Sequence, residues 1–298
     1  MKFSDQMAKA MPEGMKLPEA FRKTFDWMEA RGHLDQIEGD FSEGFNDTIL
    51  YLYPANEAEE EGASFACFVT PPYPFTFGWE ERDASLDNRY FEFARTGADG
   101  SMAGFWLDDD GKQWVVHRGS GSGSIWTGLI SDDPVDFLRL LAIGYVEPCF
   151  DEGHGATPLG AQMIAEGVDE EEWEQLRAES DEPDEEYPEP IVPTAFREFV
   201  TTTFGVTIPE TALELLNDHA SDQPYDRNDP FVSWVESVQP EGEARDFIED
   251  FEEELDEETI KAIEEAQERI NSIDNDPNLS DEEKLERISD IYEEIERL

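Results

Sequence analysis

The chain has 298 residues, 74 of them acidic and 21 basic, so its formal net charge is −53. Such a charge opposes binding to a nucleic-acid backbone or an anionic membrane, and it favours a basic macromolecular partner. Because 38% of the residues are hydrophobic and 20 are Phe, the composition excludes generic disorder and predicts a folded core in one or two domains.

The first 150 residues have the pattern of an antiparallel sheet bracketed by helices. Residues 18–30 predict a helix with Phe21, Phe25 and Met28 on one face. Asp133 and its neighbours offer an N-cap before Pro134, where a second helix begins. Aromatic and β-branched runs between the two helices predict strands at residues 48–53, 64–70, 89–95, 102–107, 113–118 and 125–130. This order of elements predicts an α+β fold with a twisted antiparallel sheet.

Two loops of this sheet have recognisable compositions. Residues 107–113 predict a hairpin in which Gly111 adopts a positive φ. Residues 119–124 alternate Gly and Ser, and we interpret them as a flexible connection between two strands. Phosphate binding is the rival interpretation of this loop, but phosphate-cradling loops join a strand to a helix.

An acidic tract follows the sheet. Residues 169–189 hold twelve acids and a single base, Arg177. We expect a short acidic helix around Trp173 and Leu176, followed by an extended linker that ends at Pro183, Pro188 and Pro190.

Two further folded segments are predicted after the tract. Residues 195–204 and 212–216 predict short helices, and this second piece ends at residues 229–235. Residues 256–298 predict a helical hairpin, since Ile and Leu recur at three- and four-residue spacing on both arms and a capping box lies at residues 280–283. The two apolar stripes are either the hairpin's own core or a surface for docking or self-association.

The predicted organisation has four segments. They are an α+β domain at residues 1–150, an acidic linker at 151–192, a small helical extension at 193–240 and an acidic helical hairpin at 241–298. The net charge is −15 over residues 1–150, −20 over 151–240 and −18 over 241–298. Adaptation to high salt is an alternative cause of the acidity, but this uneven distribution argues against it.

Residue types that carry chemistry are sparse. Cys67 and Cys149 make no metal or redox spacing and are expected to be reduced core residues. The strongest metal candidate is the weak cluster of Asp151, Glu152 and His154. No motif brings a nucleophile, a base and a metal together, so we predict a protein that is not an enzyme and needs no cofactor. Without an apolar N-terminal stretch or a membrane-length window, we expect a cytoplasmic protein.

Four short motifs resemble the SMI1/KNR4 (SUKH) superfamily. They are the polar turn at residues 96–101, the strand that begins Gly104-Phe105-Trp106-Leu107-Asp108, the following strand with Val115 and Val116, and the helix start at residues 131–138. The opening Leu17-Pro18-Glu19-Ala20-Phe21 is also similar to that family's first helix, so the resemblance covers residues 15–148. Residues 231–235 bear a weaker similarity to tails of some bacterial members. The resemblance implies a SUKH-like α+β fold and, in bacteria, an immunity protein that binds and blocks a toxin.

Charge and resemblance lead to one hypothesis for function. A carboxylate surface can occupy the Lys/Arg-lined groove of a basic toxin, such as a nuclease, without any catalysis of its own. Trp173 and Tyr187 are either aromatic anchors for the partner or residues that pack within the protein. The predicted contact residues are Asp169, Glu170, Glu171, Glu172, Trp173, Glu174, Asp181, Glu182, Asp184, Glu185, Glu186 and Tyr187.

Two alternatives stay open. A nucleic-acid mimic that inhibits a basic host or phage protein would have the same electrostatics and a different target. A scaffold or assembly protein would work through self-association of residues 256–298.

Overall fold

The computed structural model describes residues 1–36, 48–58, 60–70, 89–98, 100–120, 126–180, 182–216 and 226–238. The chain divides into two compact units, Met1–Gln239 and Pro240–Leu298. The first unit therefore takes in the predicted α+β domain, the acidic segment and the helical extension up to Gln239. The predicted hairpin at residues 256–298 lies outside the described residues and stays a prediction.

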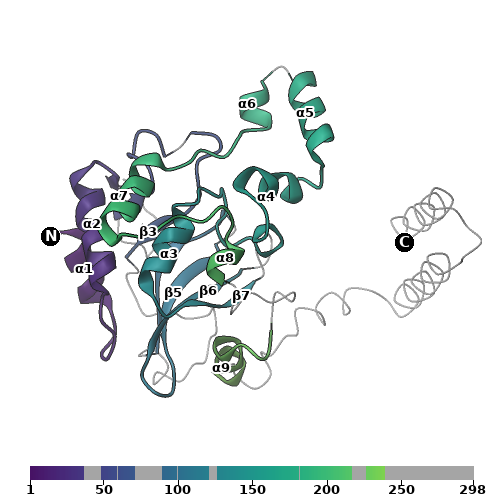
Figure 1. Cartoon of the computed structure of the whole chain (residues 1–298). Helices are drawn as coiled ribbons and strands as arrows, with labels where there is room; N and C mark the ends of the chain where they lie inside the picture. The colour runs from purple at the N-terminus through teal and green to yellow at the C-terminus, as the bar shows by residue number, and fades with distance from the viewer. Residues whose placement is uncertain are drawn as a thin grey trace, which may run out of the picture. The chain divides into compact units, whose positions relative to one another are not determined.

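Seven strands in the described part of the chain form one antiparallel sheet, in which every strand pairs with the next one in sequence (Figure 1). The predicted antiparallel sheet is thus confirmed. Its strands are β1 (Leu34–Gln36), β2 (Thr48–Tyr51), β3 (Cys67–Val69), β4 (Tyr90–Arg95), β5 (Met102–Leu107), β6 (Gln113–Arg118) and β7 (Thr127–Ser131). The sequence did not predict β1, which pairs Leu34 with Leu50.

The hairpin between β5 and β6 forms as predicted. Gly111 has φ of 76°, in the left-handed region. The carboxylate of Asp108 accepts hydrogen bonds from the backbone N–H groups of Asp110 and Lys112, and from the indole N–H of Trp114 at 2.9 Å. One side chain therefore fixes both the tip and the base of the turn.

Helices cover one face of this sheet and build the main core. In α2, Phe21, Phe25 and Met28 are buried as the sequence predicts, and the ring of Phe21 contacts Phe93 of the sheet edge-on at 4.9 Å. Asp133 caps α3 by accepting the N–H of Val135, again as predicted. The helices before the acidic tract are α1 (Phe3–Ala10), α2 (Glu19–Ala30), α3 (Pro134–Leu141), the 3₁₀ turn η2 (Asp151–Gly153) and α4 (Pro158–Ala165).

The later helices are α5 (Glu170–Glu179), α6 (Pro183–Glu186), α7 (Thr194–Phe204), α8 (Leu213–Leu216) and α9 (Pro230–Val238). Phe196 and Val200 of α7 join the core that α2 and α3 build, and Trp27 of α2 stacks on Phe199 at 4.5 Å. The helical extension therefore packs on the α+β domain.

On the other face of the sheet, α9 covers the part formed by β4 to β7. Phe231 and Trp234 pack with Tyr90 and Trp106 of the sheet in a second apolar cluster. Asp229 joins the helix to the edge strand, because one carboxylate oxygen caps α9 at the N–H of Phe231 and the other accepts the N–H of Leu129 at 2.8 Å. The segment that the sequence placed at the end of a second piece is thus part of the main unit.

A largely buried ion pair lies on this same face, with side chains 24% (Arg118) and 12% (Glu92) exposed. Both Nε and Nη2 of Arg118 donate to one carboxylate oxygen of Glu92 at 3.1 Å, and the hydroxyl of Tyr90 donates to it at 3.2 Å. Burial raises the pKa of Glu92, and the guanidinium of Arg118 works against that rise. Such a pair adds little net stability. The loss of one partner is costly, however, because it leaves the other charge unpaired in an apolar environment.

Two smaller points complete the fold. Cys67 and Cys149 are both buried free thiols, as expected for core cysteines, and burial raises the pKa of Cys67 to about 11. Within the described ranges, no helix combines the length and the apolar character that crossing a membrane requires.

Candidate functional site

The acidic tract folds into a pair of short helices that we call the acidic arm, residues 169–187. It consists of α5 and α6, and Figure 1 shows both helices standing out beside α4 from the part of the unit that contains the sheet. The chain leaves the body through α4 and returns through residues 188–193. The predicted acidic helix is thus present, but the predicted extended linker is wrong at residues 183–186, which form α6.

The first helix of the arm begins with a capping box. The carboxylate of Asp169 accepts the N–H of Glu172 at 2.9 Å, and the carboxylate of Glu172 accepts the N–H of Asp169 at 3.1 Å. Three consecutive glutamates, residues 170–172, fill the first turn, where the helix dipole favours negative charge. The same acidic residues that create the surface charge therefore also help to form the helix.

Trp173 forms the interior of the arm. Its side chain is only 3% exposed, and its ring meets that of Tyr187 edge-on, with centroids 5.8 Å apart. The sequence left two roles open for Trp173, and in the structure this residue packs within the protein. A partner cannot reach its indole. Tyr187 is half-buried on the other side of the same contact.

Arg177 holds the two helices together. One Nη atom donates to the backbone carbonyls of Pro183 and Tyr187, and the other pairs with the carboxylate of Asp184 at 2.8 Å. Its side chain is 22% exposed, so these bonds are partly shielded from water. A single cation therefore offsets part of the repulsion in the arm and fixes the position of α6 on α5.

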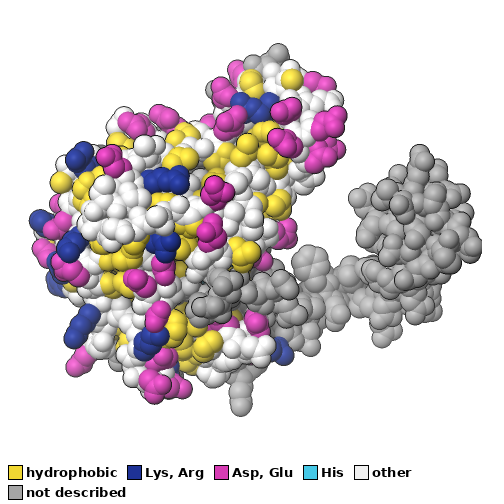
Figure 2. Space-filling view, viewed as in Figure 1, with side chains coloured by type: hydrophobic (Ala, Val, Ile, Leu, Met, Phe, Trp, Pro, Cys, Tyr) yellow, Lys and Arg dark blue, Asp and Glu magenta, His cyan; other side chains and the backbone are white. Residues whose placement is uncertain are grey.

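The acidic side chains of the arm that the structure describes are exposed to solvent. Figure 2 shows acidic side chains over the surface of the projecting lobe. Asp181 lies outside the described residues, as does the side chain of Glu185. The exposed predicted contact residues are Asp169, Glu170, Glu171, Glu172, Glu174, Glu182, Asp184 and Glu186.

Buried tyrosines bind the chain on the body before α4 and after α6, on the two sides of the arm. On the return side, the hydroxyl of Tyr53 donates to the carbonyl of Ile191 at 2.6 Å, and the N–H of Ile191 donates to the carbonyl of Gly62 at 2.8 Å. Gly62 has φ of 81°, and a Cβ there would overlap the carbonyl of Glu189, so glycine is required. On the outgoing side, the hydroxyl of Tyr145 donates to the carbonyl of Ala156 at 2.6 Å and accepts the N–H of Ala212.

These anchors were missed in the sequence analysis. Tyr53 was predicted only as a strand residue, and Gly62 and Tyr145 carried no motif. Burial raises the pKa of Tyr53 to about 12, so the hydroxyl that donates to Ile191 stays protonated well above neutral pH. On the return side, therefore, the chain is bonded to the body at Ile191, shortly after the arm ends.

The predicted metal candidate has a different character in the structure. His154 is buried, and the ring of Trp126 lies edge-on to it at 5.1 Å. Its Nε2 is buried with no hydrogen-bond partner, and burial lowers the pKa of this imidazole to about 4. No group of three or more His, Cys, Asp or Glu side chains that could hold a metal occurs in the ranges that the structure describes.

Acid should therefore destabilise the protein through His154. An imidazole with a folded-state pKa of about 4 binds its proton less tightly than the unfolded chain does, so stability is lost as the pH falls below about 6.5 towards 4. We expect a loss of about 2 kcal/mol between pH 7 and pH 5 that is absent in a His154→Leu variant. Urea unfolding at both pH values measures it, and equal losses in the two proteins would contradict it.

The Gly-Ser loop connects β6 to β7 as predicted. The N–H of Ser120 donates to the hydroxyl of Ser101 at 3.3 Å, and that of Gly119 donates to the hydroxyl of Thr127 at 3.2 Å. Residues 121–125 lie outside the described part of the chain.

Loss of Arg177 should open the arm without unfolding the body. Because its bonds are confined to residues 177–189, we expect Arg177→Gln to raise amide hydrogen exchange in residues 170–187 by about tenfold, as the loss of charge-assisted bonds implies. Exchange in β5 and β6 should not change. Arg227, which is 73% exposed, is the matched control for an arginine-to-glutamine change. Unchanged exchange in the arm would show that Arg177 does not hold it.

The fold and the site together define a mixed α+β protein that carries a charged helical arm. Comparisons of the chain with protein-family models, with curated proteins and with solved structures find no match in any of the three. The resemblance to the SMI1/KNR4 superfamily therefore remains a prediction based on the four motifs.

Proposed function

We propose that this protein is a non-enzymatic binding protein that occupies the basic surface of another protein through the carboxylates of the acidic arm. The observation that carries the proposal is the set of eight exposed acidic residues of the predicted contact set, which lie on an arm that Arg177 holds together and that Tyr53 secures to the body on the return side. A fixed array loses less conformational entropy on binding than a flexible acidic tail does.

Electrostatics favours such an arm as the first point of contact. Clustered like charges steer an oppositely charged partner and raise the association rate. The partner has to present Lys and Arg side chains over a surface that matches two short helices. The substrate groove of an enzyme that binds phosphates is a surface of this kind, and carboxylates that occupy it exclude the substrate.

The motifs add a biological role to this physical one. We propose a SUKH-like fold for the sheet and its helices, and an immunity protein that neutralises a cognate basic toxin, for which a nuclease is the leading candidate. The acidic arm follows the residues that carry the resemblance, so the sheet would be the support and the arm the inhibitory element.

Co-purification of the full-length chain with the product of the adjacent gene tests this function. We expect the neighbouring protein to bind, to be toxic when expressed alone, and to be tolerated when this chain is co-expressed. The complex should weaken at 1 M salt, where the screening length falls to roughly 3 Å. A neighbouring protein that is harmless and does not bind, or a purified chain that turns over a substrate, would refute the proposal.

A further inference from the structure

Large apolar side chains are exposed in one region of the unit, next to the ends of the acidic arm. Among the described residues, the five large hydrophobic side chains with the highest exposure are Met1 and four residues that we call the foot patch: Phe65 (51%), Ile164 (41%), Val192 (39%) and Leu213 (44%).

All four members of the foot patch border the same stretch of chain, residues 144–164. The N–H of Phe65 donates to the carbonyl of Val146, and that of Leu213 donates to the carbonyl of His154. The backbone of Val192 lies against Gly144, because a Cβ added at Gly144 would be 3.1 Å from the Cα of Val192. Ile164 belongs to α4, at the outgoing end of the arm. Figure 2 shows apolar side chains gathered where the arm joins the body.

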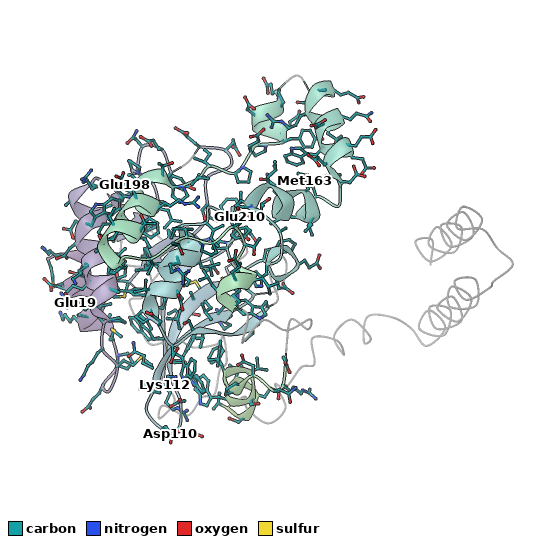
Figure 3. All side chains as sticks on the ribbon, viewed as in Figure 1. Glu19, Asp110, Lys112, Met163, Glu198 and Glu210 are labelled. Atoms are coloured by element: carbon teal, nitrogen blue, oxygen red, sulfur yellow. The ribbon has the colours of Figure 1, made fainter. Side chains whose placement is uncertain are left out.

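The helix α4 is itself unusual in this chain. Although 32% of the residues are charged, the eight residues of α4 include no charged side chain. Ala161 alone among them is buried, and Met163, labelled in Figure 3, is half-buried on the segment between the arm and the body. Pro158, Leu159 and Met163 are partly covered, and Ile164 and Ala165 at the C-terminal end of α4 are exposed, so this end of the helix leaves apolar surface for another contact.

Single exposed apolar residues are common, but a cluster of them marks an interaction surface. The charge around this one identifies its occupant. The patch borders a tract with twelve acids and one arginine, so a cationic partner is attracted to it and an anionic one is repelled. Protein interfaces also combine an apolar centre with a polar rim, and here the patch would be the centre and the arm the rim.

We propose that the foot patch is the apolar half of the partner site, and that it binds leucine-like or aromatic side chains of a cationic amphipathic segment whose Lys and Arg residues contact the arm. The inference rests on the proposed function, because it assumes a basic partner. It adds that the partner's basic surface contains apolar anchors, and that part of the affinity is insensitive to salt.

Two labelled peptides of equal length and charge test this inference on the full-length chain. One alternates Lys and Leu at helical spacing, and serine replaces every leucine in the other. By fluorescence anisotropy, we expect the leucine peptide to bind at least about tenfold more tightly, in accord with the burial of one or more leucine side chains. This advantage should persist at 1 M NaCl, where the attraction to the arm is screened.

The double variant Ile164→Gln and Leu213→Gln leaves the net charge unchanged and alters only exposed side chains, so the fold should be retained. We expect it to reduce the advantage of the leucine peptide to less than about twofold, whereas Ala10→Gln on α1, which is also exposed, should preserve it.

Each other outcome overturns a defined part of the account. Equal affinity for the two peptides, or a full advantage in the double variant, refutes the foot patch but leaves the acidic arm intact. A shift to a smaller oligomer in the double variant, with no preference for leucine in the wild type, would identify the patch as a contact between copies of this chain. If neither peptide binds at low salt, the proposed function fails and the inference fails with it.

Discussion

Replacing Arg118 with Met is expected to lower the free energy of unfolding by about 3 kcal/mol. Arg118 is the cation that faces Glu92 on the sheet, and the side chain of Glu92 is 12% exposed. Without Arg118, the carboxylate would either stay charged in an apolar environment or take up a proton at a cost in free energy. Urea unfolding followed by tryptophan fluorescence measures the change.

The control for this prediction is an exposed pair in the same protein. Arg22 contacts Asp5 at 3.1 Å with side chains 37% and 53% exposed, so Arg22→Met should cost less than about 1 kcal/mol. Replacing both Glu92 and Arg118 with apolar residues should restore much of the stability, since no buried charge then remains. If Arg118→Met and Arg22→Met lower the free energy of unfolding by equal amounts, the pair on the sheet is not shielded from solvent as we describe.

Neutralising the arm is expected to weaken binding to a basic partner by about one hundredfold. In this variant, Gln replaces four exposed glutamates: Glu170, Glu171, Glu174 and Glu186. Within the described part of the chain, none of the four caps α5 or pairs with Arg177. Glutamine is as good a helix former as glutamate, so the arm should keep its structure. Four charge pairs at up to about 1 kcal/mol each account for a loss of this size.

A second variant with the same change in net charge separates the arm from the general acidity of the chain. It replaces four exposed acids outside the arm with their amides: Glu13, Glu60, Asp110 and Glu198. Asp110 and Glu198 are labelled in Figure 3. We expect it to weaken binding by less than about threefold, because screening limits exposed charges to a range of roughly 10 Å. Equal losses in the two variants would mean that net charge, and not the arm, sets the affinity.

The sheet was largely predictable because its signals are local. The strands β5 and β6 have the predicted bounds, since alternating apolar residues flank a turn in which Gly111 supplies the required φ. The strand β1 was missed because it has three residues, Leu34, Asp35 and Gln36, with no alternation long enough to detect. It exists through its pairing with β2, which a local pattern does not contain.

The site was predictable in its charge but not in its architecture. The capping box of Asp169 and Glu172 is a local signal, and it forms. The burial of Trp173, the anchoring role of Tyr53 and the requirement for glycine at position 62 all depend on contacts between distant segments. Likewise, α9 covers the sheet because Phe231 and Trp234 meet Tyr90 and Trp106, residues far away in sequence.

The most direct test of the central claim is the dissociation constant of the co-purifying partner, measured over a salt series from 0.05 to 1 M for the wild-type chain and the four-glutamine arm variant. We predict that the wild-type affinity falls steeply as salt rises, that the variant starts about one hundredfold weaker, and that the two curves converge at high salt. Curves that coincide over the whole series would contradict the assignment of the arm as the partner-binding element.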